Sequence, residues 1–96
     1  MYGTVARIHV KPGMEEQFLA CLEKDPGEVA AYLYRLDADP NLFYLVAVFE
    51  SKAAYEANAR RPQTDARYWQ VREYFDSEPE WHDGEIVFAF SETNSR

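Results

Sequence analysis

The run of eight residues Leu42-Phe43-Tyr44-Leu45-Val46-Ala47-Val48-Phe49 contains no charged side chain. β-Branched and aromatic residues of this kind favour a β-strand. A strand whose sheet has one face in water alternates apolar and polar residues, but this run is apolar on both sides. Protein must therefore cover both faces of the sheet at this strand, and this requirement limits the possible folds more than any other feature of the sequence.

Weaker patterns before and after this run predict the remaining elements. Alternation favours a strand over 2–10, with Ile8 on its more apolar side and His9 on the other. Turn-forming residues at 38–41 join the apolar run to a preceding β-rich segment as a hairpin. The predicted elements are a strand at 2–10, a helix at about 12–24, strands at 29–37 and 42–50, helices at 51–60 and 64–75, and a strand at 85–90.

Proline and hydroxyl residues set the expected limits of the two consecutive helices. Ser51 is a candidate N-cap of the first helix, Pro62 is expected to break it, and Thr64 is expected to cap the second. The element order is then βαββαβ, an α+β fold with a four-stranded antiparallel sheet. We expect one domain at residues 1–91 and a short C-terminal tail at 92–96.

The length of the chain bears on how the sheet is covered. A chain of 96 residues, 16 % of them aromatic, leaves much of its surface in water when it folds alone. Two helical segments cover only one face of a sheet, and an exposed apolar face promotes aggregation. We therefore expect a homodimer in which the two subunits pack sheet face against sheet face.

Charge and cysteine content argue against several classes of protein. Seventeen acidic and ten basic residues give a formal net charge of −7, which repels a phosphate backbone, so nucleic-acid binding is not expected. The single cysteine, Cys21, forms no intrachain disulfide, and no Cys/His cluster has zinc-site spacing. The sequence has no signal-peptide pattern and no apolar run of roughly 18 residues, so we expect a cytoplasmic protein without a membrane partner.

Two passages from a strand into a helix are the most specific motifs of the sequence. They are Val5-Ala6-Arg7-Ile8-His9-Val10-Lys11-Pro12-Gly13 and Phe49-Glu50-Ser51-Lys52-Ala53-Ala54-Tyr55. Together with the element order they resemble the antibiotic biosynthesis monooxygenase domain over nearly the whole chain. The resemblance implies a ferredoxin-like subunit, a dimeric α/β barrel and a pocket between sheet and helices. Similar proteins include cofactor-independent oxygenases of polycyclic phenols and quinones, and haem-degrading enzymes.

The resemblance also indicates which residues to consider for catalysis. Many members carry a histidine at the helical position that Asn58 occupies here, and haem-degrading members need an asparagine where this chain has Ala6. No histidine lies at 51–75, so haem degradation is not expected. The cofactor-independent oxygenases use asparagine and tryptophan on this stretch to position substrate and oxygen. Asn58 and Trp69 are therefore the candidate catalytic residues, separated by Pro62, and no cofactor or metal is implied.

Residues of the predicted hairpin are candidates for substrate binding. Tyr32, Tyr34 and Tyr44 alternate with apolar neighbours, and each offers either a hydroxyl group to a ligand or ordinary packing. Arg35 lies in the same strand, where a charged side chain needs an ionic partner or a ligand.

Basic and aromatic residues in the second half of the chain are further candidates. Arg72 belongs to a helical region with three other arginines, at 60, 61 and 67, which either binds an anionic substrate or forms weak exposed ion pairs. Trp81 and His82 lie between acidic residues and either gate a pocket or contact the partner subunit. His9 is expected at an interface or in solvent.

The sequence thus predicts a homodimer that binds a small apolar or aromatic molecule. The leading hypothesis is a cofactor-independent monooxygenase acting on a phenol- or quinone-type substrate. That reaction needs a proton acceptor, a donor for the resulting oxyanion and an apolar pocket, while the substrate anion supplies the electron. A non-catalytic ligand-binding or assembly protein is the alternative, and an isomerase or lyase on the same scaffold is a third.

Overall fold

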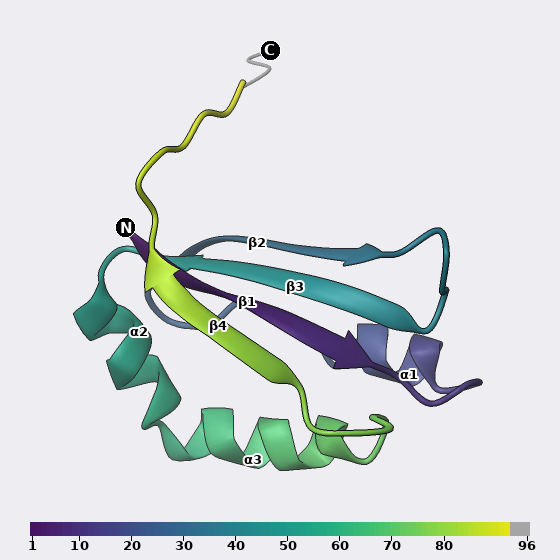
Figure 1. Ribbon diagram of the computed structural model, residues 1–96. Helices are drawn as coiled ribbons and strands as arrows, with labels where there is room; N and C mark the ends of the chain where they lie inside the picture. The colour runs from purple at the N-terminus through teal and green to yellow at the C-terminus, as the bar shows by residue number, and fades with distance from the viewer. Residues whose placement is uncertain (93–96) are drawn as a thin grey trace.

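The computed structural model describes residues 1–92. Within these residues four strands and three helices occur in the order β1 (Tyr2–His9), α1 (Glu15–Ala20), β2 (Glu28–Arg35), β3 (Leu42–Phe49), α2 (Lys52–Ala59), α3 (Pro62–Arg72) and β4 (Glu80–Glu85). The strands form one antiparallel sheet in the order β2-β3-β1-β4 (Figure 1). The predicted α+β, ferredoxin-like βαββαβ architecture is confirmed. Of the predicted tail at 92–96, residues 93–96 lie outside the described part.

The fully apolar run is the interior strand β3. It pairs with β1 over its whole length, from Tyr2↔Phe49 to His9↔Leu42, and with β2 on its other side. One face of β3 is buried under the helices through Phe43, Ala47 and Phe49. The opposite face, which includes Val46, receives no helix and is half-buried. The two-sided apolar pattern therefore reflects one face covered by this chain and one face that this chain leaves uncovered.

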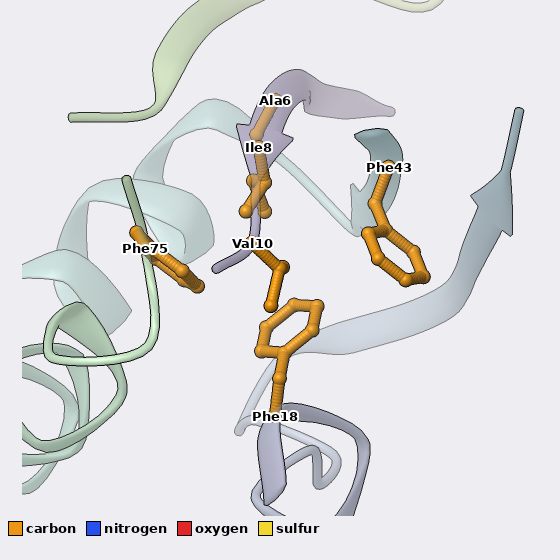
Figure 2. Close-up of a cluster of buried hydrophobic side chains, with 6 residues drawn as sticks. All are labelled: Ala6, Ile8, Val10, Phe18, Phe43 and Phe75. Atoms are coloured by element: carbon orange, nitrogen blue, oxygen red, sulfur yellow. The ribbon is translucent and has the colours of Figure 1, made fainter. Parts of the chain in front are cut away.

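The helix-covered face of the sheet holds the main core. Figure 2 shows six buried residues, which come from β1, α1, β3 and the bridge that joins Val10 after β1 to Phe75 after α3, namely Ala6, Ile8, Val10, Phe18, Phe43 and Phe75. Phe18 of α1 is the centre of this cluster, since its ring meets those of Phe43 and Phe75 edge-on at centroid distances of 5.7 and 5.3 Å. Edge-to-face contacts of this kind add stability beyond the apolar area that they bury.

The two consecutive helices begin differently. The Ser51 hydroxyl accepts a hydrogen bond from the Ala54 backbone N–H at 3.1 Å, which confirms the predicted N-cap of α2. The prediction for α3 is wrong, because this helix begins at Pro62 and its N-cap is Arg61. Proline suits a first helical turn, where the missing N–H needs no partner. The Thr64 hydroxyl instead donates to Asn58 Oδ1 at 3.1 Å.

Helix α1 is shorter than predicted and ends at Ala20 rather than near residue 24. An isolated helix of this length is marginal, so tertiary contacts decide where it ends. The residues that follow α1 contact helix α3, because Arg67 of α3 bonds to both Glu23 and Asp25. Segment 21–25 therefore runs as an irregular rim beside the helix-covered face of the sheet.

The last strand lies five residues earlier than predicted. Strand β4 is Glu80–Glu85, whereas the sequence pattern favoured 85–90. The backbone contact between Asp76 N–H and the His9 carbonyl, 2.9 Å, brings the chain to the end of β1. Pairing then proceeds from Arg7↔Glu80 to Tyr2↔Glu85, and Tyr2 is the first residue of β1. The apolar residues after Glu85 consequently extend past the sheet, as the C-terminal part of the ribbon in Figure 1 shows.

Candidate functional site

A cavity of about 1020 Å³ lies between the helix-covered face of the sheet, helices α2 and α3, and the rim at 21–25. Its sheet wall is apolar and comes from all three strands that carry the core, including Ile8, Leu33, Leu45 and Ala47. The helices contribute Tyr68 and further apolar groups. An apolar hollow of this size is typical of sites for small organic molecules.

One wall of the cavity carries a polar cluster that we name the Tyr55–Asp83 pair. The Tyr55 hydroxyl of α2 donates to Asp83 Oδ1 of β4 at 2.9 Å. Burial, followed by the hydrogen bond to Asp83 and its charge, raises the pKa of Tyr55 to about 12. Tyr55 therefore keeps its proton at neutral pH and acts as a donor, while Asp83 keeps a carboxylate oxygen available for a second partner.

Thr4 lies beside this pair and also lines the cavity. It is opposite Asp83 in the β1–β4 register, and it is 4 % exposed. Among buried side-chain nitrogen and oxygen atoms of residues 1–92, Thr4 Oγ1 alone has no hydrogen-bond partner. A buried hydroxyl without a partner lowers the stability of the fold. Its oxygen makes the otherwise apolar sheet face polar at this one place.

A second polar group, the Asn58–Asp25–Arg67 network, joins α2 and α3 to the rim. Asn58 is 6 % exposed and donates through Nδ2 to Asp25 Oδ2 at 3.1 Å. Arg67 bonds to Asp25 and to Glu23, the latter at 2.8 Å. Partial burial opposes the charge on Arg67, but the two carboxylates outweigh it and raise its pKa. The positive charge of Arg67 is thus balanced by Glu23 and Asp25, which favours, for Arg67, the ion-pair alternative over binding of an anionic substrate.

Asn58→Ala is expected to lower the free energy of unfolding by about 1–3 kcal/mol, because it leaves Asp25 and Thr64 without their amide partner in a buried network. Urea denaturation at fixed protein concentration measures the change. Gln63→Ala, on the exposed side of α3, is the matched control and is expected to shift stability by less than about 0.5 kcal/mol. Unchanged stability with lost activity would contradict this structural role and favour direct contact with substrate.

The structure divides the predicted site residues between the cavity and other surfaces. Asn58 and Trp81 line the cavity, although Trp81 is 47 % exposed. Tyr32 is opposite Val46 in the sheet and alternates with Ala31, so its side chain, 64 % exposed, lies on the face opposite the cavity. Trp69, 59 % exposed on α3, does not line it. Asn58 and Trp69 are therefore not brought together in the way that the resemblance implies.

Other predicted residues lie on the face of the sheet that bears no helix. Tyr34 pairs with Tyr44 across β2 and β3, with ring centroids 5.8 Å apart, on the side opposite the cavity. His82 is opposite Val5 in the sheet and lies 3.6 Å from a Glu80 carboxylate oxygen. These three residues are placed for contacts with whatever covers that face.

The remaining predicted residues make local contacts. The Arg35 guanidinium lies over the Phe43 ring at 5.2 Å, and Arg72 donates to the Phe75 carbonyl at 3.4 Å. His9 is held between Asp76 and Asp39, at 2.5 and 3.3 Å. None of these three side chains lines the cavity.

Sequence reasoning did not assign Tyr55, Asp83 or Thr4 to the site. The signal for Tyr55 is its position one turn after the N-cap Ser51, on the side of α2 that packs against Phe49 of the sheet. Asp83 lies before the strand predicted at 85–90, and only the register of β4 in the structure brings it opposite Thr4.

Residues 1–92 contain neither a candidate metal site nor a candidate membrane-spanning helix. No group of three or more His, Cys, Asp or Glu side chains in this part of the chain is arranged to hold a metal ion. No helix in the same part is long and apolar enough to cross a membrane.

Solved structures resemble this fold over almost its whole length. Proteins of the antibiotic biosynthesis monooxygenase type from Chloroflexus aurantiacus, Caulobacter crescentus and Bordetella bronchiseptica superpose with TM-scores of 0.78, 0.79 and 0.75. Their identities to this chain are 18, 16 and 23 %. The matches cover 94, 91 and 91 % of this chain and 96, 90 and 97 % of theirs. At this level of identity the similarity establishes the fold alone.

The sequence itself gives the family. No curated protein matches the chain. The sequence profile described as antibiotic biosynthesis monooxygenase matches residues 1–68, which include β1, both strands of the hairpin, α1, α2 and the start of α3. The chain belongs to the antibiotic biosynthesis monooxygenase family.

Proposed function

We propose that this protein binds a small aromatic molecule of phenol or quinone type in the cavity and oxidises it with dioxygen, without a bound cofactor. The observation that carries the proposal is the apolar cavity of about 1020 Å³ with the Tyr55–Asp83 pair on one wall. Family membership supports oxygenase chemistry, and the apolar walls suit both an aromatic ring and dioxygen.

The charge around the cavity favours an uncharged substrate. Its lining includes five carboxylates and two basic side chains, and Arg67, one of the two, is paired with two of the carboxylates. A ligand that carries its own carboxylate or phosphate would meet a net negative surface. The substrate is therefore a neutral hydroxylated aromatic rather than an anionic molecule, which was one of the two alternatives for the arginine-rich helical region.

The chemistry is balanced if the substrate provides all the electrons. In a hydroxylated aromatic of anthrone type, Asp83 accepts the acidic proton and Tyr55 holds the carboxylate in place through its hydrogen bond. The resulting carbanion adds dioxygen to give a peroxide at the same carbon. Loss of water from this peroxide turns the CH₂ group into a carbonyl, so one oxygen atom enters the product, the other leaves as water, and no external reductant is used.

Oxygen uptake tests the reaction. Purified protein is mixed with a panel of anthrones and hydroxynaphthalenes, and dioxygen consumption is compared with loss of substrate. We expect one dioxygen consumed for each substrate oxidised, and slower uptake for a ring of the same size that bears a carboxylate. Uptake no faster than the uncatalysed background across the whole panel would contradict the oxygenase.

Filling the cavity is expected to weaken ligand binding. Ala31 lies on the cavity side of β2, where it is opposite Ala47 in the sheet. Side chains of a strand project alternately to its two faces, so Ala31→Trp places an indole in the cavity. We expect the dissociation constant for 1-naphthol, measured by calorimetry, to rise at least about tenfold. The matched control is Ala57→Trp, an exposed α2 position outside the cavity lining, and equal affinities of the two variants would oppose this location of the site.

A non-catalytic ligand-binding protein is the second candidate. It is favoured by the placement of the two residues that the resemblance marks for catalysis, since Asn58 is engaged in its internal network and Trp69 lies outside the cavity. Saturable binding of 1-naphthol that Ala31→Trp weakens, with no oxygen uptake for any compound, would identify this second function.

A further inference from the structure

The proposed reaction also needs a hydrogen-bond donor for the oxyanion that forms on the substrate. The cavity supplies the apolar pocket, and Asp83 supplies the proton acceptor. Asn58, which the family resemblance suggests for positioning the substrate, donates to Asp25 instead. A donor for the oxyanion is therefore expected elsewhere on the cavity wall.

The hydroxyl group of Thr4 has the properties of such a donor. Thr4 lines the cavity and is 4 % exposed, and within residues 1–92 its Oγ1 atom has no hydrogen-bond partner. Alternate residues of a strand share a face, so Thr4 projects to the same side of β1 as the buried Ala6 and Ile8. A buried polar atom without a partner is uncommon in folded proteins, which makes Thr4 a candidate to bind a ligand.

The register of the sheet places Thr4 between Ala47 of β3 and Asp83 of β4. Side chains opposite each other in an antiparallel pair have Cβ atoms about 4.5–5.5 Å apart. The Thr4 hydroxyl and the Asp83 carboxylate are thus close enough to contact the same ligand atom. On the other side of Thr4, the small Ala47 side chain also lines the cavity and leaves space for an aromatic ring.

Tyr55 shows on which side of this group the Thr4 hydroxyl lies. Burial and the contact with Asp83 raise the pKa of Tyr55 to about 12, and the Thr4 hydroxyl opposes part of this rise. Thr4 Oγ1 therefore lies near the Tyr55 hydroxyl, although it makes no hydrogen bond to it in the free protein. Since Asp83 Oδ1 accepts from Tyr55, Asp83 Oδ2 and Thr4 Oγ1 remain available to a ligand.

We propose that Thr4 and Asp83 together bind a ring hydroxyl group of the substrate. That hydroxyl donates to Asp83 Oδ2, and its oxygen accepts the Thr4 O–H. The assignment rests on the proposed function, and it narrows the substrate to an aromatic with a free hydroxyl group, as opposed to an ether or an unsubstituted ring. Asp83→Asn keeps a partner for the same oxygen, since an amide N–H donates to it.

The same contact supplies the donor for the oxyanion. In an anthrone the CH₂ form and the ring-hydroxyl form are tautomers, so loss of a proton to Asp83 from either form gives the same anion. Its negative charge is shared between the carbon that adds dioxygen and the ring oxygen. Hydrogen bonds to a charged oxygen are stronger than those to a neutral one, so Thr4 stabilises the anion more than the neutral substrate.

Two ligands of similar shape test the contact without turnover. 1-Naphthol carries the hydroxyl group, and 1-methylnaphthalene carries a methyl group in its place. We measure both dissociation constants by fluorescence titration and take the ratio of the 1-methylnaphthalene value to the 1-naphthol value. Thr4→Val replaces the hydroxyl by a methyl group and is expected to lower this ratio by about five- to tenfold. Thr4→Ser keeps the hydroxyl and is expected to retain the ratio, and an unchanged ratio in Thr4→Val would overturn the proposal.

Thr64→Val is the matched control, because it removes a hydroxyl that also lines the cavity but already donates to Asn58 Oδ1. It is expected to retain the ratio. In urea denaturation without ligand, the midpoint is expected to fall in Thr64→Val and to stay the same or rise in Thr4→Val, where no hydrogen bond is lost. A lower midpoint in Thr4→Val would overturn the proposal, since the Thr4 hydroxyl would then already have a partner in the free protein, such as a bound water.

The binding measurement also separates failure of this contact from failure of the proposed function. If wild type does not bind 1-naphthol, both are overturned. If wild type binds 1-naphthol and Thr4→Val leaves the ratio unchanged, the Thr4 contact alone is overturned. If the ratio falls as expected but no compound is oxidised, the contact is supported and the oxygenase is overturned.

Discussion

Asp83→Asn is expected to reduce oxygen uptake by about 100-fold at neutral pH, the lower end of what a positioned proton acceptor contributes. The asparagine oxygen still accepts the Tyr55 hydroxyl, so the geometry of the wall is retained while the carboxylate that takes the proton is lost. Uptake is measured at saturating substrate, and 1-naphthol affinity is measured in parallel. We expect the affinity to change by less than about threefold.

The control for this variant is Glu78→Gln, which removes one negative charge at an exposed position outside the cavity lining. It is expected to retain full uptake. Tyr55→Phe separates positioning from proton transfer, because Asp83 remains but loses its donor. A smaller loss than in Asp83→Asn is expected, and equal activity of wild type and Asp83→Asn would exclude Asp83 as the proton acceptor.

Phe18→Ala is expected to lower the free energy of unfolding by about 3–5 kcal/mol, which is much of the stability of a small domain. Phe18 is 2 % exposed, and its ring connects α1 to Phe43 of β3 and to Phe75 before β4. Truncation removes both aromatic contacts and leaves a void that rigid strands on either side cannot close. Urea denaturation at fixed protein concentration measures the loss, since an associating protein has a concentration-dependent stability.

The matched control is Leu19→Ala, on the exposed side of the same helix and 41 % accessible. It is expected to cost less than about 1 kcal/mol. Similar losses in the two variants would mean that α1 contributes through its helical segment as a whole and not through insertion of Phe18 into the core.

The order of elements could be predicted because each signal was local. The apolar run at 42–49, the turn at 38–41 and the Ser51 cap each depend on a few neighbouring residues, and each is found where the sequence places it. The limits of α3 and α1 were not predictable in the same way. Pro62 can end one helix or begin the next, and the residues after α1 bond to Arg67, which is more than 40 residues away in the sequence.

The prediction of the last strand was wrong for a physical reason that also affects the candidate site. Apolar periodicity predicted a strand at 85–90, whereas the sheet contains the mostly polar residues 80–85, because the backbone contact between His9 and Asp76 sets the register. The same error concealed Asp83, since only the correct register brings it to the cavity beside Thr4. Apolar periodicity indicates which segment favours a β-strand, but it does not determine with which residues of the sheet that segment pairs.

The candidate site was predictable in location but not in composition. A pocket between sheet and helices followed from the family resemblance, and Asn58 and Trp81 line the cavity found there. Tyr34 and Tyr44 could not be assigned to a face before the strand register was known.

We expect the ligand to bind on the helix-covered face of the sheet. Intermolecular nuclear Overhauser effects between bound 1-naphthol and protein methyl groups locate the ligand. We expect effects to Ile8, Leu33, Leu45 and Ala47, which line the cavity. Effects confined to Val5, Val46 and Val48, which line a smaller hollow of about 160 Å³ on the opposite face, would contradict it.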